Sequence, residues 1–281
     1  IHAFHMPMFF IISGYFYKDQ KIGLLIKKRI FTLIVPYTVF GLFHIIVYSL
    51  MQHEFKMDYI YRLLWDNTSI GVPISGAVWF LTAMFFSDLI YALIQHGFIS
   101  IVAKNIVIVS VSLTGMLLAT FLPFRFPWAL DAALVSVGLI HCGKLIREKY
   151  TKLIEMKLWV SLLILVSSLV LVIINGYINM REGKYGIWPL FWINSIGMTI
   201  SLWNISRFIC AFLDRYKSLI MIKKWLEGIG NNSIVYLCFN QIAILLISNL
   251  VFLLFPKEDM NSIVLLSVKI GILFVTFIEL F

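Results

Sequence analysis

The sequence predicts an all-α fold, a polytopic bundle of transmembrane helices with about nine spans in this chain. The first observation is composition: of 281 residues, 61% are hydrophobic, 16% are aromatic and only 13% are charged. A soluble globular domain is nearer half apolar and a quarter charged. The second observation is that the apolar residues form runs of about 20, the length a helix needs to cross a bilayer. The third is that basic residues gather between these runs. Together these observations exclude the soluble globular class.

The apolar runs divide the chain into nine predicted spans with connections between them. Their approximate ranges are 1–17, 30–51, 76–97, 105–122, 127–146, 158–178, 187–206, 233–255 and 262–281. The sequence shows no strong internal repeat and no low-complexity linker. We therefore expect residues 1–281 to form one integral-membrane domain.

The net charge of +9 predicts a topology. Alternating connections, starting with the one after the first span, hold sixteen Lys and Arg residues, and the opposite connections hold six. Because basic loops stay in the cytoplasm, the richer set faces inward, the His5 end of the first span faces outward and the C-terminus lies inside. The basic residues do not alternate with aromatic ones along a groove. We therefore expect no nucleic acid partner and instead contact with anionic membrane lipid.

The cysteines predict neither a disulfide framework nor a zinc site. Cys142, Cys210 and Cys238 are widely spaced, without a CxxC pair, and each lies in or beside an apolar run. We expect them to be small buried residues, and we expect no metal.

Two connections predict helices that lie in the membrane interface rather than across it. Residues 59–65 form an amphipathic piece in the long outer loop 52–75. Residues 207–228 carry apolar side chains among lysines and predict a similar helix on the cytoplasmic side.

Three residues within the spans predict specific contacts, namely Ser13, Gly14 and Asp88. Ser13 and Gly14 are a small pair of the kind that lets a neighbouring helix approach closely. Asp88 lies deep in the third span, where a carboxylate needs a partner or a water-filled cavity.

The first span also carries a specific motif. Residues 4–15, Phe-His-Met-Pro-Met-Phe-Phe-Ile-Ile-Ser-Gly-Tyr, resemble the FHMPLFFxxSGY signature of the acyltransferase 3 family, the multi-spanning membrane O-acetyltransferases of bacteria. In that family the signature lies on the second transmembrane helix. The resemblance therefore implies ten spans in a complete member, and a chain that here lacks the first helix. Weaker resemblances to the same family occur at residues 27–37, 77–85, 127–131 and 230–240.

The resemblance implies an enzyme of the bacterial plasma membrane that transfers an acetyl or other acyl group from acyl-CoA to a hydroxyl of a cell-surface carbohydrate. Acetyl-CoA would be the donor and the carbohydrate the acceptor. The basic run Lys27, Lys28 and Arg29 would hold the phosphates of coenzyme A on the inside, although Thr32 stands where the family often has an arginine. The pantetheine arm would then reach toward His5, over roughly 20 Å along the first span.

His5 is the candidate for proton transfer. A neutral imidazole can take a proton from a hydroxyl near physiological pH. The alternative is a histidine that only lies at the membrane interface or orients another group. In the family the base is more often assigned to the first helix, so the resemblance implies that His5 assists this base or binds substrate.

Three further residues are candidates on the acceptor side. Trp79 would stack on a sugar ring, or only anchor its helix at the interface. Asp131 would orient a histidine or bind a sugar hydroxyl, as a second catalytic residue. Asn240 stands where the family has a histidine, so we expect it to hydrogen-bond substrate without acting as a base. His5, Trp79 and Asp131 fall at similar outer depth, which predicts an outward-opening pocket.

Two other functions are open at this point. A transporter or flippase for a glycan or lipid-linked sugar would use the same helices and aromatic residues without a thioester donor. A truncated remnant without catalysis would explain both the missing helix and Asn240. Nothing in the sequence indicates an oligomeric state.

Overall fold

The computed structural model describes residues 5–68, 76–98, 100–216, 219–254 and 271. Within these residues the regular structure is helical, apart from one isolated β-bridge between Asn179 and Lys184. This confirms the all-α prediction. The elements, in chain order, are α1 (His5–Tyr15), α2 (Ile22–Arg29), the π-helical η1 (Ile30–Ile34), α3 (Val35–Gln52), α4 (Met57–Leu64), α5 (Trp79–Gly97), α6 (Ile101–Phe121), η2 (Pro127–Ala129), α7 (Leu130–Lys149), η3 (Thr151–Glu155), α8 (Leu158–Asn175), α9 (Trp188–Arg215), α10 (Ile220–Asn231) and α11 (Ser233–Leu254).

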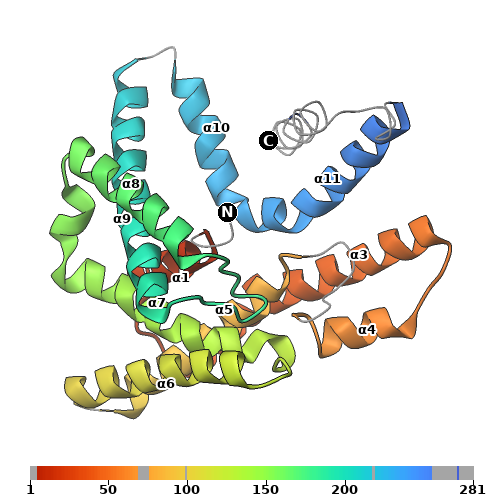
Figure 1. Cartoon of the computed structure of the whole chain (residues 1–281), viewed down its shortest axis with the longest axis horizontal. Helices are drawn as coiled ribbons and strands as arrows, with labels where there is room; N and C mark the ends of the chain where they lie inside the picture. Colours follow the sequence, from red (N-terminus) through yellow and green to blue (C-terminus); the bar gives the residue numbers. More distant parts are fainter. Residues whose placement is uncertain (1–4, 69–75, 99, 217–218, 255–270, 272–281) are drawn as a thin grey trace.

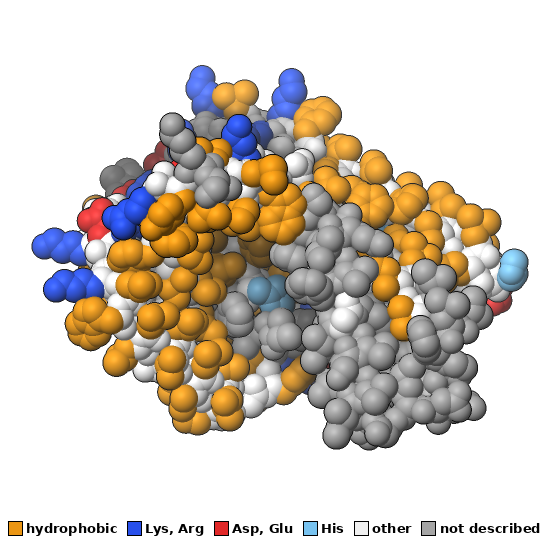
Figure 2. Space-filling view, turned by 90° about the horizontal axis from the view of Figure 1, so that it is seen from above, with side chains coloured by type: hydrophobic (Ala, Val, Ile, Leu, Met, Phe, Trp, Pro, Cys, Tyr) orange, Lys and Arg blue, Asp and Glu red, His pale blue; other side chains and the backbone are white. Residues whose placement is uncertain are grey.

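The helices form a bundle suited to a membrane. Among the described residues, five helical segments are long and apolar enough to cross one, namely Ile22–Gln52, Ile101–Phe121, Pro127–Lys149, Leu158–Asn175 and Trp188–Arg215. Figure 2 shows hydrophobic side chains over most of the described surface on one face, with Lys and Arg gathered along one edge. The count of nine spans stays a prediction, because the first and last of them include residues outside the described ranges.

Helix α7 lies at the centre of the bundle and contacts α1, α5 and α6 (Figure 1). Its buried side chains run from Asp131 to Ile146 and include small residues that let neighbouring helices approach. Helices α8 and α9 pack against each other on one side of this group, and α3 and α4 extend away from it on another (Figure 1).

Helices α1 and α7 cross with their backbones in contact. A Cβ atom added to Gly14 would lie 1.9 Å from the carbonyl oxygen of Ile140, and one added to Gly143 would lie 1.9 Å from that of Ile11. Such distances leave no room for any side chain. The packing role predicted for Gly14 is therefore confirmed, and Gly143 is its counterpart on α7.

The basic run lies inside a helix rather than in a connection. The sequence predicts a second span at 30–51, but the helix is continuous over residues 22–52. Pro36 has no N–H to donate to the carbonyl of Thr32, and the π-helical turn η1 accommodates this loss without ending the helix. Because the helix continues, Lys27, Lys28 and Arg29 have fixed directions on its surface.

The ends of α1, α5 and α7 meet in the way that the charge pattern predicts. At one end, Nη1 of Arg147 donates to the carbonyl oxygens of Tyr15, at 3.0 Å, and Tyr17, at 2.5 Å. Nε2 of His96 lies 3.1 Å from the carbonyl oxygen of Gln20. These contacts join segments next to three connections that the positive-inside rule assigns to the cytoplasm.

The opposite end joins connections assigned to the outside. The backbone N–H of Trp128 donates to the carbonyl oxygen of Trp65 at 3.2 Å. Nε of Arg181 donates to the carbonyl oxygen of Thr68 at 3.1 Å. The structure thus brings the predicted outer loops together and the predicted inner loops together, as the positive-inside argument requires.

The two interfacial predictions had different outcomes. The outer amphipathic piece is present as the short helix α4. The helix predicted over 207–228 is present only from Ile220, as α10, so its predicted start is wrong. Helix α9 continues to Arg215, because its apolar pattern extends through Phe212, and the backbone becomes extended at Tyr216 before α10 begins at Ile220.

Candidate functional site

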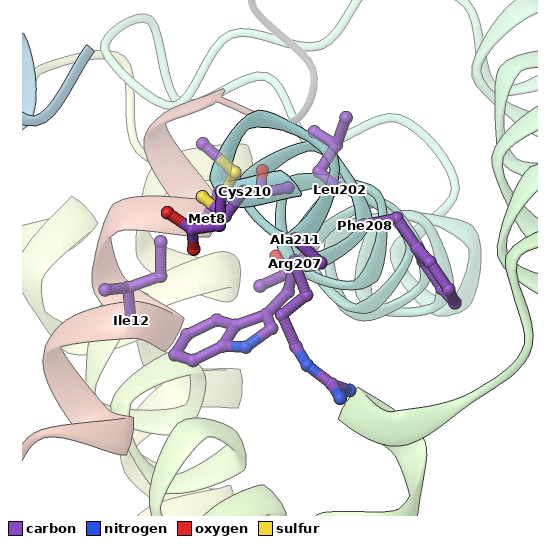
Figure 3. Close-up of a pocket in the computed structure, with 11 residues that line it drawn as sticks. Met8, Ile12, Leu202, Arg207, Phe208, Cys210 and Ala211 are labelled. Atoms are coloured by element: carbon purple, nitrogen blue, oxygen red, sulfur yellow. The ribbon is translucent and has the colours of Figure 1, made fainter. Parts of the chain in front are cut away.

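Helix α1 presents two faces with different neighbours. Phe10 and Ile11 are buried on the side of α5 and α7, and the ring of Phe10 meets that of Phe80 edge-on at 5.0 Å. Met8 and Ile12 point the other way and line a cavity shared with α9 (Figure 3). His5 precedes these two residues by three and seven positions, so it lies on the same face of the helix. The histidine of the signature, half-buried at the start of α1, therefore belongs to the cavity side.

The α1–α9 cavity has a volume of about 810 Å³. Figure 3 shows Met8 and Ile12 reaching from α1 toward residues of α9. The α9 wall is apolar at Leu202, Trp203, Phe208 and Ala211, and it is polar at Ser206, Arg207, Cys210 and Asp214. An elongated ligand with an apolar body and polar ends would fit such a lining.

Aromatic rings pack around Trp203, which lines this cavity. The ring of Trp203 lies 4.6 Å from that of Tyr15 and stacks on that of Phe16 at 6.0 Å. Arg207 donates to the carbonyl oxygen of Ile154, which fixes its guanidinium near the inner connection. The sequence reasoning missed the α9 residues altogether. Trp203 and Arg207, an aromatic and a cation one helical turn apart, were the available signal.

A buried ion pair links α1, α5 and the helix that carries the basic run. Nε of Arg29 lies 2.7 Å from Oδ2 of Asp88, whose side chain is 1% exposed. The side chain of Ser13 also interacts with this carboxylate. Asp88 thus has the partner that an intramembrane carboxylate requires. Arg29 is turned inward, whereas Lys27 and Lys28 are exposed.

Asp131 is held by a second buried ion pair. It pairs with Arg125, and both side chains are almost fully buried. Nη2 of Arg125 also donates to the carbonyl oxygen of Met180 at 3.2 Å, and Tyr185 lies buried beside the guanidinium. Sequence reasoning missed Arg125, although it is a charge only six residues before Asp131 in a chain with few charges. The role predicted for Asp131 toward a histidine or a sugar stays a prediction.

The loop between α8 and α9, which covers this ion pair, is itself held by the hydrogen bonds and the ion pair of Glu182. Oε1 of Glu182 accepts hydrogen bonds from Tyr177 and Asn179, each at 2.8 Å, and Oε2 lies 3.0 Å from Nζ of Lys184. Lys184 first, and then Tyr177, lower the pKa of Glu182. The carboxylate therefore stays ionised and keeps the turn closed down to a lower pH than an isolated glutamate would.

The outer-end candidates share a depth but not a cavity. His5, Trp79 and Asp131 lie at or next to the first residues of α1, α5 and α7, which run in parallel. Trp79 is 3% exposed and packs edge-on to Phe80 at 6.4 Å. The lining of the α1–α9 cavity includes none of these three candidates, and the cavity comes nearest to His5 at Met8, three positions along α1. Asn240 belongs to α11, and its side chain lies outside the described residues.

The metal-ligating residue types are dispersed. In the described ranges, His, Cys, Asp and Glu side chains do not gather in groups of three or more that would hold a metal ion. All three cysteines are free. Cys238 is buried as predicted and Cys142 is partly buried, but Cys210 is exposed because it faces the α1–α9 cavity.

Comparison with known proteins identifies the family. Residues 1–279 match the family model Acyl_transf_3, described as an acyltransferase domain. No curated protein and no solved structure matches the chain. The match covers the signature helix, the basic run and the central helix α7 together, and the helical bundle is that of a membrane protein. The chain therefore belongs to the acyltransferase 3 family and has the domain of a membrane acyltransferase.

Proposed function

We propose that this protein transfers an acetyl or similar acyl group from acyl-CoA to a hydroxyl of a cell-surface carbohydrate, in the bacterial plasma membrane. The observation that carries the proposal is the α1–α9 cavity, which runs along the face of the signature helix on which His5 lies. It offers an apolar passage within the membrane bundle whose lining on α1 begins at Met8, three residues after His5 and on the same helix face.

The donor would enter from the inner side. Lys27 and Lys28 are exposed and free to bind the phosphates of coenzyme A, while Arg29 is held by Asp88. The contact between Ser13 and Asp88 places this basic run beside α1. Eight residues separate Ser13 from His5, about 12 Å along a helix. The flexible pantetheine arm would lie along the apolar wall and present its thioester near His5.

The reaction exchanges one carbon–sulfur bond for a carbon–oxygen bond and moves one proton in two transfers. The acceptor hydroxyl oxygen attacks the thioester carbonyl carbon, the carbon–sulfur bond breaks, and the thiolate of coenzyme A leaves. The proton of the hydroxyl passes to imidazole and then to the thiolate. His5 would act as this base or as the group that orients it.

The acceptor would approach from the outer end of α1. There we propose Trp79, Asp131 and Asn240 as groups that shape or contact the sugar site. Because Asp131 is paired with Arg125, the pair as a whole would present hydrogen-bonding groups to the sugar. Because Trp79 is buried, it would act by supporting the outer end of α1 through Phe80.

The proposal is tested with acetyl-CoA labelled in its acetyl group, added to the inner side of membrane vesicles that contain the protein. We expect label in the carbohydrate fraction and an equal amount of free coenzyme A. A transporter or flippase would move a glycan across the vesicle membrane without consuming thioester. Absence of both label and free coenzyme A would contradict the proposal and favour a non-catalytic protein.

The Lys27→Ala/Lys28→Ala double variant is expected to raise the KM for acetyl-CoA by about tenfold, with little change in kcat, because each lost phosphate contact is charge-assisted. The difference should shrink as salt is added. The matched control is Lys149→Ala/Lys152→Ala, which removes two exposed charges from another inner connection. Equal KM values for the two double variants would exclude the basic run as the phosphate site.

A further inference from the structure

A second cavity lies between α6, α7 and α9, apart from the one beside α1. Its volume is about 440 Å³. Its lining includes Asn105 and Ser112 from α6, His141 from α7 and Trp192 from α9. Gly138, which has no side chain, leaves the space that the Ser112 hydroxyl and the edge of the Trp192 ring occupy. None of these residues takes part in the acyl transfer proposed above.

The interior of the α6–α7–α9 cavity holds a polar group without a partner. Ser112 is 3% exposed, and its hydroxyl makes no hydrogen bond. Other buried serines in these helices donate to a carbonyl in the preceding turn, as Ser136 does to Ala132 at 2.8 Å and Ser195 to Phe191 at 2.7 Å. Ser112 instead lines the cavity with its hydroxyl buried beside Gly138 and unpaired, so a polar group of a ligand in the cavity would satisfy it.

His141 adds a second polar group. Its Nδ1 lies 3.2 Å from the hydroxyl of Tyr91, which is fully buried. Nε2 is a donor if the tyrosine hydroxyl donates to Nδ1, and an acceptor if Nδ1 donates to the hydroxyl. A protonated carboxyl group, which has both a donor and an acceptor, would therefore match Ser112 and either tautomer of His141.

The rim of the cavity is apolar and faces lipid. Val109 is 56% exposed and Leu113 is 42% exposed, and both line the cavity from α6. Helix α6 is long and apolar enough to cross a membrane. Exposed valine and leucine at this depth contact acyl chains, so the cavity is accessible from the side, through the bilayer.

We propose that this cavity binds a single-chain amphiphile, a long-chain fatty acid, which enters from the bilayer with its neutral carboxyl group toward Ser112 and His141. Ser112 is the twelfth of the 21 residues of α6, close to the middle of the span. A phospholipid headgroup stays at the interface, half a hydrocarbon core away. The small protonated carboxyl group of a single-chain fatty acid would reach this depth, because Ser112 and His141 would hydrogen-bond its hydroxyl and carbonyl.

The probe is a dibrominated stearic acid, whose bromine atoms quench nearby tryptophan fluorescence, titrated into the purified protein in lipid nanodiscs. We expect saturable quenching, and we expect Trp192→Phe to lose the saturable component. A dibrominated phosphatidylcholine in the same discs should quench gradually and without saturation. Saturable quenching by the phospholipid alone would overturn the assignment to a fatty acid.

Two variants test the residues that line the cavity, and a third is the control. Val109→Phe fills the rim and is expected to weaken binding of the brominated acid at least tenfold. The control, Ile106→Phe, adds the same ring to a position on α6 that is 60% exposed and does not line the cavity, and it should leave binding unchanged. Ser112→Ala removes one hydroxyl and should weaken binding about three- to tenfold. Equal binding by all three variants and the wild type would overturn the proposal.

Discussion

Asp88→Ala is expected to be the most damaging single substitution in the membrane core. Asp88 is 1% exposed and neutralises Arg29, which is turned into the bundle toward it. Removing the carboxylate leaves a guanidinium in an apolar environment without its counter-charge. Breaking a buried pair in this way costs about 3–5 kcal/mol. The measurement is thermal unfolding of the purified protein in detergent, followed by intrinsic fluorescence.

Two further variants separate the lost pair from a general loss of packing. Arg29→Met/Asp88→Leu removes both charges with little change in volume and should recover most of the lost stability. Asp58→Ala breaks the pair with Arg62 on α4, where the carboxylate is 49% exposed, and should cost less than about 1 kcal/mol. Asp88→Ala and Asp58→Ala with equal unfolding temperatures would contradict the importance of the buried pair.

Gly143→Ala is expected to have the second largest effect, although it adds one methyl group. The new Cβ would lie 1.9 Å from the carbonyl oxygen of Ile11, which is backbone and cannot rotate away. Helices α1 and α7 would have to separate along their crossing. Overpacking of this kind costs about 1–3 kcal/mol, and it should also lower acyl transfer because α1 carries His5.

The matched control is Gly228→Ala in α10, where an added Cβ meets nothing within 4 Å. Alanine favours a helix over glycine by up to about 1 kcal/mol, so this variant should be as stable as the wild type or more so. If both glycine variants unfolded at the same temperature, the close crossing of α1 and α7 would not exist in the folded protein.

The sequence predicted the fold class and the grouping of the loops, and both follow from strong physical constraints. Apolar runs of about 20 residues have few alternatives to membrane helices. The alternation of successive spans fixes which helix ends share a side of the membrane, and the ends of α1, α5 and α7 meet accordingly. Clusters such as Lys144 with Arg147 predict that this side is the cytoplasmic one, which stays a prediction.

The neighbours of each helix could not be predicted in the same way. Asp88 and Arg29 lie far apart in the chain, and several inner basic residues were possible partners for the carboxylate. The continuity of the helix over residues 22–52 could not be predicted, because Pro36 normally indicates a helix break. The π-helical turn compensates for the hydrogen bond that Pro36 cannot donate. In each case the outcome depends on packing between distant segments.

Only part of the candidate site could be predicted from the sequence. His5 and the basic run stand out because polar residues in apolar segments are rare. The α1–α9 cavity was not predicted, since α1 is apolar on most sides, the polar residues of α9 do not form a single stripe, and no periodicity shows which faces meet. Trp203 and Arg207 consequently became candidates only when the structure placed α9 against α1.

The most direct test of the central claim, that the imidazole of His5 works at the reacting centre beside the α1–α9 cavity, is the initial rate of labelled acetyl transfer by His5→Gln. We predict a rate lower by about a hundredfold or more at unchanged unfolding temperature, as expected for loss of a proton-transfer group. The control, His53→Asn, replaces an exposed histidine whose positive φ asparagine tolerates, and it should keep the wild-type rate. A His5→Gln rate within about twofold of the wild type would contradict the account.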